Sequence, residues 1–266
     1  MSILALLGHA WRRHRVALLV LGTAFFLFQW LFTKLAPSPS QAGAIQQLLQ
    51  LLPPAFMQMF GNEIAANLNP RGALSFGWAH PFGILLAGAW VARVSAGALA
   101  GEIGGGTMDL MAARPVPRWS AVTAAVLALA AGLAFILLMG WAGTATGIAG
   151  RPSLGLNANL FLRIAAADWM LFLSFGCIGL LISAAGRSGG TVLGIVSATI
   201  GVSFALDYLA RAWAPIHWTR ALSLFMYYRP QRLLADGFAP GDVIPFLLTT
   251  AVASTLAFVV FAKRDL

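Results

Sequence analysis

Long apolar runs separated by short polar segments make up most of this chain. A helix that crosses the ~30 Å hydrocarbon core of a bilayer needs about 20 mostly apolar residues. Six runs reach that length, and they predict membrane-spanning helices at residues 16–35, 76–98, 119–142, 161–184, 190–210 and 243–262. We therefore expect an all-α membrane protein that forms a single transmembrane domain over residues 1–266.

Shorter amphipathic segments lie around the predicted spans. Apolar residues recur on one helical face of residues 2–12, which predicts an interfacial helix ahead of the first span. Residues 36–75 show helical spacing interrupted by two prolines, and they predict a pair of short interfacial helices. Residues 143–160 are glycine-rich and predict a plain loop. Ahead of the last span, Pro230 could start a short interfacial or re-entrant helix that ends at Gly237.

The composition fits a membrane protein and excludes a soluble one. The chain is 59% hydrophobic and 9% charged, with a mean hydropathy of +0.82, whereas a soluble domain carries roughly 25% charged residues. The net charge of +9 then indicates anionic lipid headgroups as contacts rather than nucleic acid. Arg12, Arg13 and Arg15 precede the first span, so we expect a multi-pass protein of the cell membrane with both termini in the cytoplasm.

The charged residues that fall inside or near the predicted spans include Arg93, Arg163, Asp168 and Asp207. Such side chains face protein or water rather than lipid. Arg93 lies close to the end of the second span and could extend toward the headgroups. Asp207 could pair with Arg211 four residues later on the same helix face. Asp168 could form an interhelical hydrogen bond or contact a substrate.

Small residues repeat every four positions along the fifth predicted span. Gly190, Gly194 and Ala198 share one helix face, where small side chains let two helices approach closely. This ridge could pack against the fourth span of the same chain. It could instead meet a second chain across the two-fold axis of a dimer.

The sequence contains no motif for ATP hydrolysis. Neither Lys34 nor Lys263 has the flanking glycines of a phosphate-binding loop, so we expect this chain not to be an ATPase. The histidines are scattered away from cysteine and from carboxylates, and no metal site is predicted. Ser188 lies in a G-x-S-G sequence, and His217 could act as its base in an intramembrane serine protease. The predicted topology places these two residues on opposite sides of the bilayer.

One polar segment interrupts the apolar pattern between the second and third predicted spans. Residues 101–118 read GEIGGGTMDLMAARPVPR. Thr107 suits a helix N-cap, Asp109 would lie in the first turn near the positive end of the helix dipole, and Pro115 would end the helix. The segment therefore predicts a short helix with an apolar face on a glycine-rich hinge.

This segment resembles the cytoplasmic loop between the second and third spans of ABC-2 type permeases, the membrane subunits of ABC exporters. The similar pattern is an acid, Gly-Thr, an apolar residue, a second acid and a closing Pro-Val-x-Arg. The order Tyr-Tyr-Arg-Pro, Leu-Leu, Gly and Pro-Gly-Asp before the last span, and the closing Arg-Asp-Leu, also resemble that family. One difference is that Ile103–Gly105 stands where relatives often carry charges.

The resemblance implies a fold like that of type V ABC exporters and a role as a permease subunit. A coupling helix would dock in a separate ATP-binding cassette subunit, expected in two copies, which would bind ATP and magnesium, and this chain would hold no cofactor. A second copy of the chain or a sister permease would complete the pathway. The residues implied to bind the ATP-binding subunit are Glu102, Thr107, Met108, Asp109, Leu110, Met111, Arg114, Pro115 and Arg118. The alternative is a membrane scaffold or assembly factor that binds a cytoplasmic partner without transporting.

Overall fold

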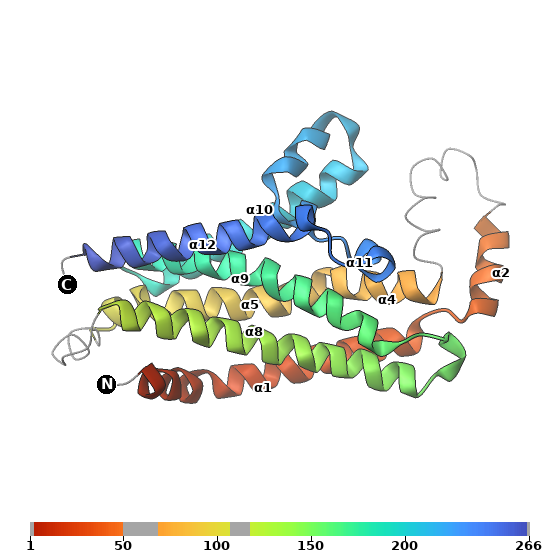
Figure 1. Ribbon diagram of the computed structural model, residues 1–266, viewed down its shortest axis with the longest axis horizontal. Helices are drawn as coiled ribbons and strands as arrows, with labels where there is room; N and C mark the ends of the chain where they lie inside the picture. Colours follow the sequence, from red (N-terminus) through yellow and green to blue (C-terminus); the bar gives the residue numbers. More distant parts are fainter. Residues whose placement is uncertain (1–2, 50–68, 107–117, 265–266) are drawn as a thin grey trace.

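The computed structural model describes residues 3–49, 69–106 and 118–264, and this part of the chain is all-helical. The long helices lie side by side along the longest axis of the molecule (Figure 1). The α-helices are α1 (Ile3–Leu35), α2 (Pro39–Leu49), α4 (Pro70–Ala79), α5 (Pro81–Ala98), α6 (Ala100–Gly104), α8 (Arg118–Ala149), α9 (Phe161–Ala185), α10 (Gly189–Ala212), α11 (Pro230–Asp236) and α12 (Pro240–Ala262). Short 3-10 helices also occur: η1 (Pro152–Leu154), η2 (Ala158–Leu160), η3 (Ala214–Leu222) and η4 (Leu224–Tyr227).

Within the described ranges, six stretches are helical, long and apolar enough to cross a membrane. They run Trp11–Leu35, Pro70–Ala98, Trp119–Ala149, Ala158–Ala185, Gly189–Arg211 and Pro240–Ala262. The predicted all-α fold with six candidate spans is therefore confirmed. The α9 helix forms the centre of the bundle. In its most apolar stretch of 18 residues, 72% of the residues are buried, whereas the corresponding shares are 28% for α10 and 17% for α12.

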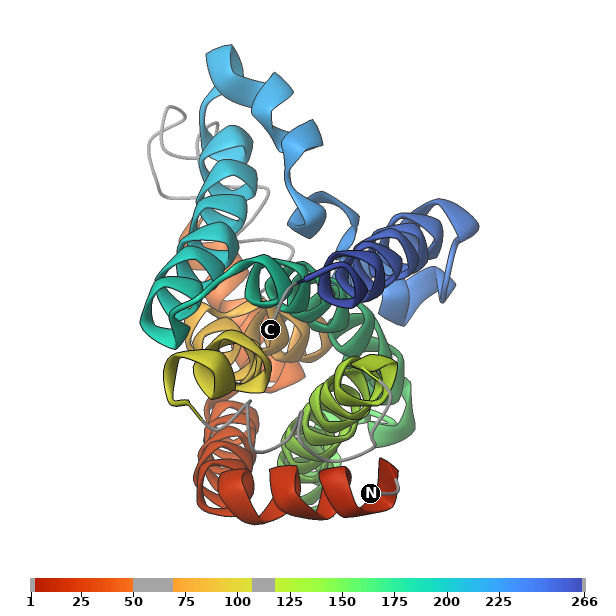
Figure 2. The ribbon, with the colours of Figure 1, turned by 90° about the vertical axis from the view of Figure 1, so that its left-hand side faces the viewer.

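The amphipathic N-terminal segment and the first span form one helix, α1, rather than two. The first turns of α1 lie across one end of the bundle, and the rest of the helix runs along it (Figure 2). No proline or glycine stands between Gly8 and Gly22, so no helix-breaking residue separates the two parts. The predicted boundary at residue 12 therefore lies inside one continuous helix and is not a helix end.

The α8 helix continues to Ala149, so the prediction of a plain loop over residues 143–160 is wrong. The glycines there face α1. A Cβ at Gly143 would lie 2.2 Å from the Phe26 carbonyl oxygen, and one at Gly147 would lie 2.6 Å from the Thr33 Cβ. Glycine at these positions lets the two helix backbones meet, which explains a glycine-rich sequence without a turn.

The second span is broken at His80 into α4 and α5, and it begins at Pro70 rather than at the predicted residue 76. His80 is extended, with ψ of 139°, because Pro81 disfavours helical geometry at the residue before it. The His80 Nδ1 atom then caps α5 by accepting a hydrogen bond from the Phe82 amide at 3.2 Å. Of the helix pair predicted within residues 36–75, α2 is present, and residues 50–68 lie outside the described part.

The segment between α10 and α12 is helical but irregular. It contains η3, which rises away from the long helices (Figure 1), followed by η4 and α11. The α11 helix begins at Pro230 and is capped by Gly237, whose φ of 78° is a left-handed value that favours glycine. This short helix was predicted from the same two residues.

Candidate functional site

The candidate functional site is the end of the bundle that carries α6, which we call the α6 end. The first turns of α1 and the last turn of α12 lie at the same end (Figure 1). Most residues implied to bind a partner subunit lie outside the described residues; these are Thr107, Met108, Asp109, Leu110, Met111, Arg114 and Pro115. The side chain of Arg118, which begins α8, is not described either. Glu102 is described, and it belongs to α6.

An ion pair joins α6 to the first turns of α1. The Arg13 guanidinium donates to the Glu102 carboxylate. The Glu102 side chain is only 12% exposed and that of Arg13 is 41% exposed. Because the carboxylate is largely shielded from water, this pair is screened less than an ordinary surface pair. The pair holds the start of the 101–118 segment against α1.

Hydrogen bonds tie the ends of α6 and α12 to the end of α9. The Ala100 amide, at the start of α6, donates to the Ser183 hydroxyl at 3.0 Å. The Arg264 guanidinium, just past α12, donates to the Ala184 carbonyl at 2.6 Å. Both bonds satisfy groups at helix termini that lack a partner within their own helix.

Glycines bring the backbone of α6 against the turn between α9 and α10. A Cβ at Gly189 would lie 3.0 Å from the Ala96 carbonyl oxygen and 3.3 Å from the Gly101 Cα. A Cβ at Gly104 would lie 3.0 Å from the Arg187 carbonyl oxygen. These neighbours are backbone atoms, so they cannot rotate away. The backbone of α6 is therefore packed directly against the turn between α9 and α10.

The small-residue face of α10 lies on the open surface of this chain. Gly190, Gly194 and Ala198 are exposed, and a Cβ at Gly194 would meet no atom within 4 Å. The opposite face, which includes Val192 and Val196, is buried against the bundle at 1% and 2% exposure. The alternative that this ridge packs against the fourth span of the same chain therefore does not describe the structure.

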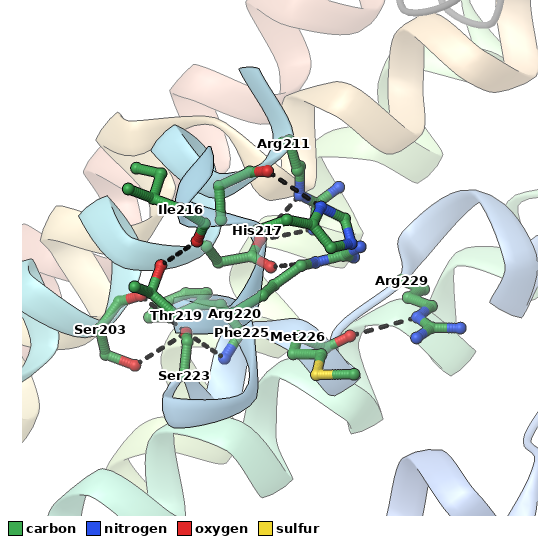
Figure 3. Close-up of polar contacts among 12 residues, drawn as sticks. Ser203, Arg211, Ile216, His217, Thr219, Arg220, Ser223, Phe225, Met226 and Arg229 are labelled. Carbon is green, nitrogen blue, oxygen red and sulfur yellow. Dashed lines mark hydrogen bonds and ion pairs between the residues drawn. The ribbon is translucent and has the colours of Figure 1, made fainter. Parts of the chain in front are cut away.

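A three-residue ion cluster holds the other end of α10. The Asp207 carboxylate accepts from Arg211 at 2.6 Å and 2.8 Å and from Arg220 at 2.8 Å (Figure 3). Its side chain is only 7% exposed. Nearby, the Ser203 and Ser223 hydroxyls lie 3.0 Å apart. These contacts tie α10 to η3 and to the start of η4. The Asp207–Arg211 pair is the one predicted from spacing.

Asp168 is buried in the middle of the bundle, at 3% exposure. Its carboxyl group lies against the hydroxyl of Tyr228, which in turn donates to the Trp78 carbonyl at 3.5 Å. Among the described residues, the Asp168 Oδ1 and Trp78 Nε1 atoms have no hydrogen-bond partner. Burial, followed by the Asp168 charge, raises the pKa of the Tyr228 phenol well above its usual value. The phenol therefore stays protonated and can act as a donor. Asp168 therefore lies in the interior of this chain, beside the Tyr228 side chain that follows η4.

A family model described as "ABC-2 family transporter protein" matches residues 12–266. This chain belongs to the ABC-2 transporter family. The match covers nearly the whole chain and agrees with the resemblance seen in residues 101–118. No curated protein matches the chain. Members of this family are the membrane components of transporters. With six candidate spans, this member is a multi-pass membrane protein.

The fold of this ABC-2 family member separates the residues of the serine protease alternative. Ser188 is the N-cap of α10, and His217 lies in η3 beyond the other end of that helix. A helix of 24 residues is roughly 36 Å long at about 1.5 Å per residue. Catalysis requires the two side chains within hydrogen-bond reach, so they do not form a catalytic pair.

Two further contacts, one at each end of the bundle, were not predicted from the sequence. Arg93 is exposed, and its Nε donates to the His14 Nδ1 at 3.3 Å, which links α5 to α1. Arg220 binds Asp207 across 13 residues. Helical spacing reveals partners three or four residues apart and carries no information on such distant ones.

Proposed function

We propose that this chain is the permease subunit of an ABC exporter, which forms the substrate pathway as a dimer and is driven by a separate ATP-binding subunit. Family membership and the fixed base of the 101–118 segment support this most. A segment that transmits force must be attached firmly at its base, and α6 is bonded to α1 and α9 and packed on α10.

The proposed mechanism uses these attachments in order. ATP and magnesium bind to the two partner subunits in the cytoplasm, on the same side as both termini of this chain. Closure of the partners pushes the segment that follows α6. The Arg13–Glu102 pair carries the motion to α1, and the backbone contact of Gly189 with Gly101 carries it to α10. Rigid spans then exchange inward-facing and outward-facing arrangements.

The dimer is proposed to form through the open face of α10. Gly194 and Ala198 leave room for a second helix to approach, and lipid is the other neighbour available to that face. The partner is a second copy or a sister permease. For a homodimer, Gly194→Cys in a Cys177→Ser background should give a chain-to-chain crosslink, and Val259→Cys on the exposed face of α12 should not. Crosslinking of the α12 variant alone would contradict this interface.

The coupling proposal is tested with a charge placed in the predicted helix. Met111→Arg should abolish stimulation of the partner's ATPase activity and ATP-dependent export in proteoliposomes, because an apolar contact would receive an unpaired charge. Ser153→Arg adds the same charge at an exposed position of η1, away from α6, and should leave both activities intact. Unchanged export by Met111→Arg would overturn the proposal. A stimulated ATPase without transport in the wild type would instead favour the scaffold or assembly function.

A further inference from the structure

A cavity of about 340 Å³ lies among α1, α5 and α8. This volume is within the range of small-molecule sites, about 300–1,000 Å³. The cavity is lined by residues of all three helices, including Trp11, His14 and Leu18 from α1, Trp90 from α5, and Ala128 and Ala131 from α8. The exposed surface of the lining is almost entirely apolar, so the cavity suits a hydrocarbon group rather than a polar solute.

The cavity arises because small side chains face large ones. The Trp90 Nε1 atom donates a hydrogen bond to the Leu129 carbonyl oxygen at 3.1 Å. The Trp90 and His14 rings also make an edge-to-face contact, with 5.7 Å between their centroids, so the Trp90 ring is held in place. Opposite α1, α8 presents Ala128 and Ala131, which do not reach across the space. Trp11, which also lines the cavity, is 55% exposed. The walls are therefore ordered and partly open to the exterior.

Three arginines lie within one helical turn of residues that line this apolar space. Arg15 lies one turn after Trp11, and Arg12 lies one turn after the cavity residue Gly8, so each follows a lining residue of α1 by one helical turn. Arg93 lies one turn after Trp90 and bonds to His14, which lines the cavity. Each of the three is exposed, and none pairs with a carboxylate in the described part of the chain. Arg13 differs, since it pairs with Glu102.

We propose that this cavity binds an acyl chain of one acidic glycerophospholipid, whose phosphate is held by Arg12, Arg15 and Arg93. The first turns of α1 lie across the end of the bundle, where headgroups of the leaflet on that side would meet them (Figure 2). The apolar cavity and the three nearby arginines together match a lipid that carries both a hydrocarbon chain and a negative charge. The site lies on the helix that also carries Arg13, so the bound lipid stabilises the part of α1 that holds α6. The inference goes beyond the transport function and requires only that the chain spans a membrane.

The test is lipid binding to the purified chain by native mass spectrometry, with phosphatidylglycerol and phosphatidylcholine of the same acyl chains as probes. The wild type should retain one phosphatidylglycerol per chain and prefer it over phosphatidylcholine. The double variant Arg12→Gln, Arg15→Gln should bind phosphatidylglycerol roughly 30-fold more weakly, the loss expected for two cations near a headgroup. The matched control Arg187→Gln, Lys263→Gln removes two exposed charges from the same end and should bind as the wild type does.

A second variant keeps the test independent of those charges. Ala131→Leu fills the cavity from α8 and should lower retention of phosphatidylglycerol, whereas Ala251→Leu on the exposed face of α12 should not. Equal retention by the wild type and by both test variants would overturn the proposal, as would a free fatty acid found in place of the phospholipid. Because no ATP-binding subunit is present in this assay, its outcome is separate from the test of Met111→Arg.

Discussion

Gly189, the first residue of α10, gives a sharp test of the packing at the α6 end. In Gly189→Ala the new methyl group would lie 3.0 Å from the Ala96 carbonyl oxygen and 3.3 Å from the Gly101 Cα. Overpacking of this kind costs about 1–3 kcal/mol, and replacing a helical glycine by alanine returns about 0.5–1 kcal/mol. We therefore expect a net loss of up to about 2.5 kcal/mol in the free energy of unfolding.

Gly194→Ala is the matched control, because it makes the same change on the same helix. A Cβ at Gly194 meets nothing within 4 Å, so this variant should stabilise the isolated chain by up to about 1 kcal/mol. The free energy of unfolding of each variant is measured by unfolding the purified chain in a detergent titration, followed by tryptophan fluorescence. Gly189→Ala should also lower stimulation of the partner ATPase, because α10 is pushed away from α6. The reasoning is refuted if Gly189→Ala is as stable as Gly194→Ala.

Three further outcomes follow from the described contacts. Arg220→Gln should destabilise the chain by about 1–3 kcal/mol, since it removes a charged partner from the shielded Asp207 carboxylate; a double-mutant cycle with Asp207→Asn measures the coupling, and a coupling of zero would exclude the bond. Tyr228→Phe should cost a similar amount by removing the hydroxyl beside buried Asp168, as judged by unfolding, and an unchanged midpoint would argue against that contact. Gly143→Ala places a methyl group 2.2 Å from a carbonyl oxygen of α1, so it should reduce the yield of folded protein in size-exclusion chromatography more than Gly194→Ala does.

The sequence predicted those features that depend on local pattern. Apolar length identified the six candidate spans, because a lipid environment requires long uninterrupted helices. Pro230 and Gly237 marked α11, because each has a strong conformational preference at a helix end. The Asp207–Arg211 pair followed from a spacing of four residues.

Features that depend on distant contacts were missed or misread. Gly143 and Gly147 were interpreted as loop residues, since a glycine in sequence does not reveal whether it serves a turn or a helix contact. The Arg13–Glu102 pair joins residues 89 positions apart, and no local pattern reports such a pair. Residues 107–117 stay a prediction, because they lie outside the described part of the chain.

Contact between the residues after α6 and an ATP-binding subunit is the basis of the proposed function, and site-specific crosslinking can detect that contact. The native Cys177 is buried and can be replaced in a Cys177→Ser background. In a complex purified with the ATP-binding subunit, Met111→Cys should form a crosslink to that subunit, and the exposed control Ser153→Cys should form none. We expect ATP to change the yield of the Met111→Cys crosslink. An intact complex that gives no crosslink from Met111→Cys, or an equal yield from Ser153→Cys, would contradict it.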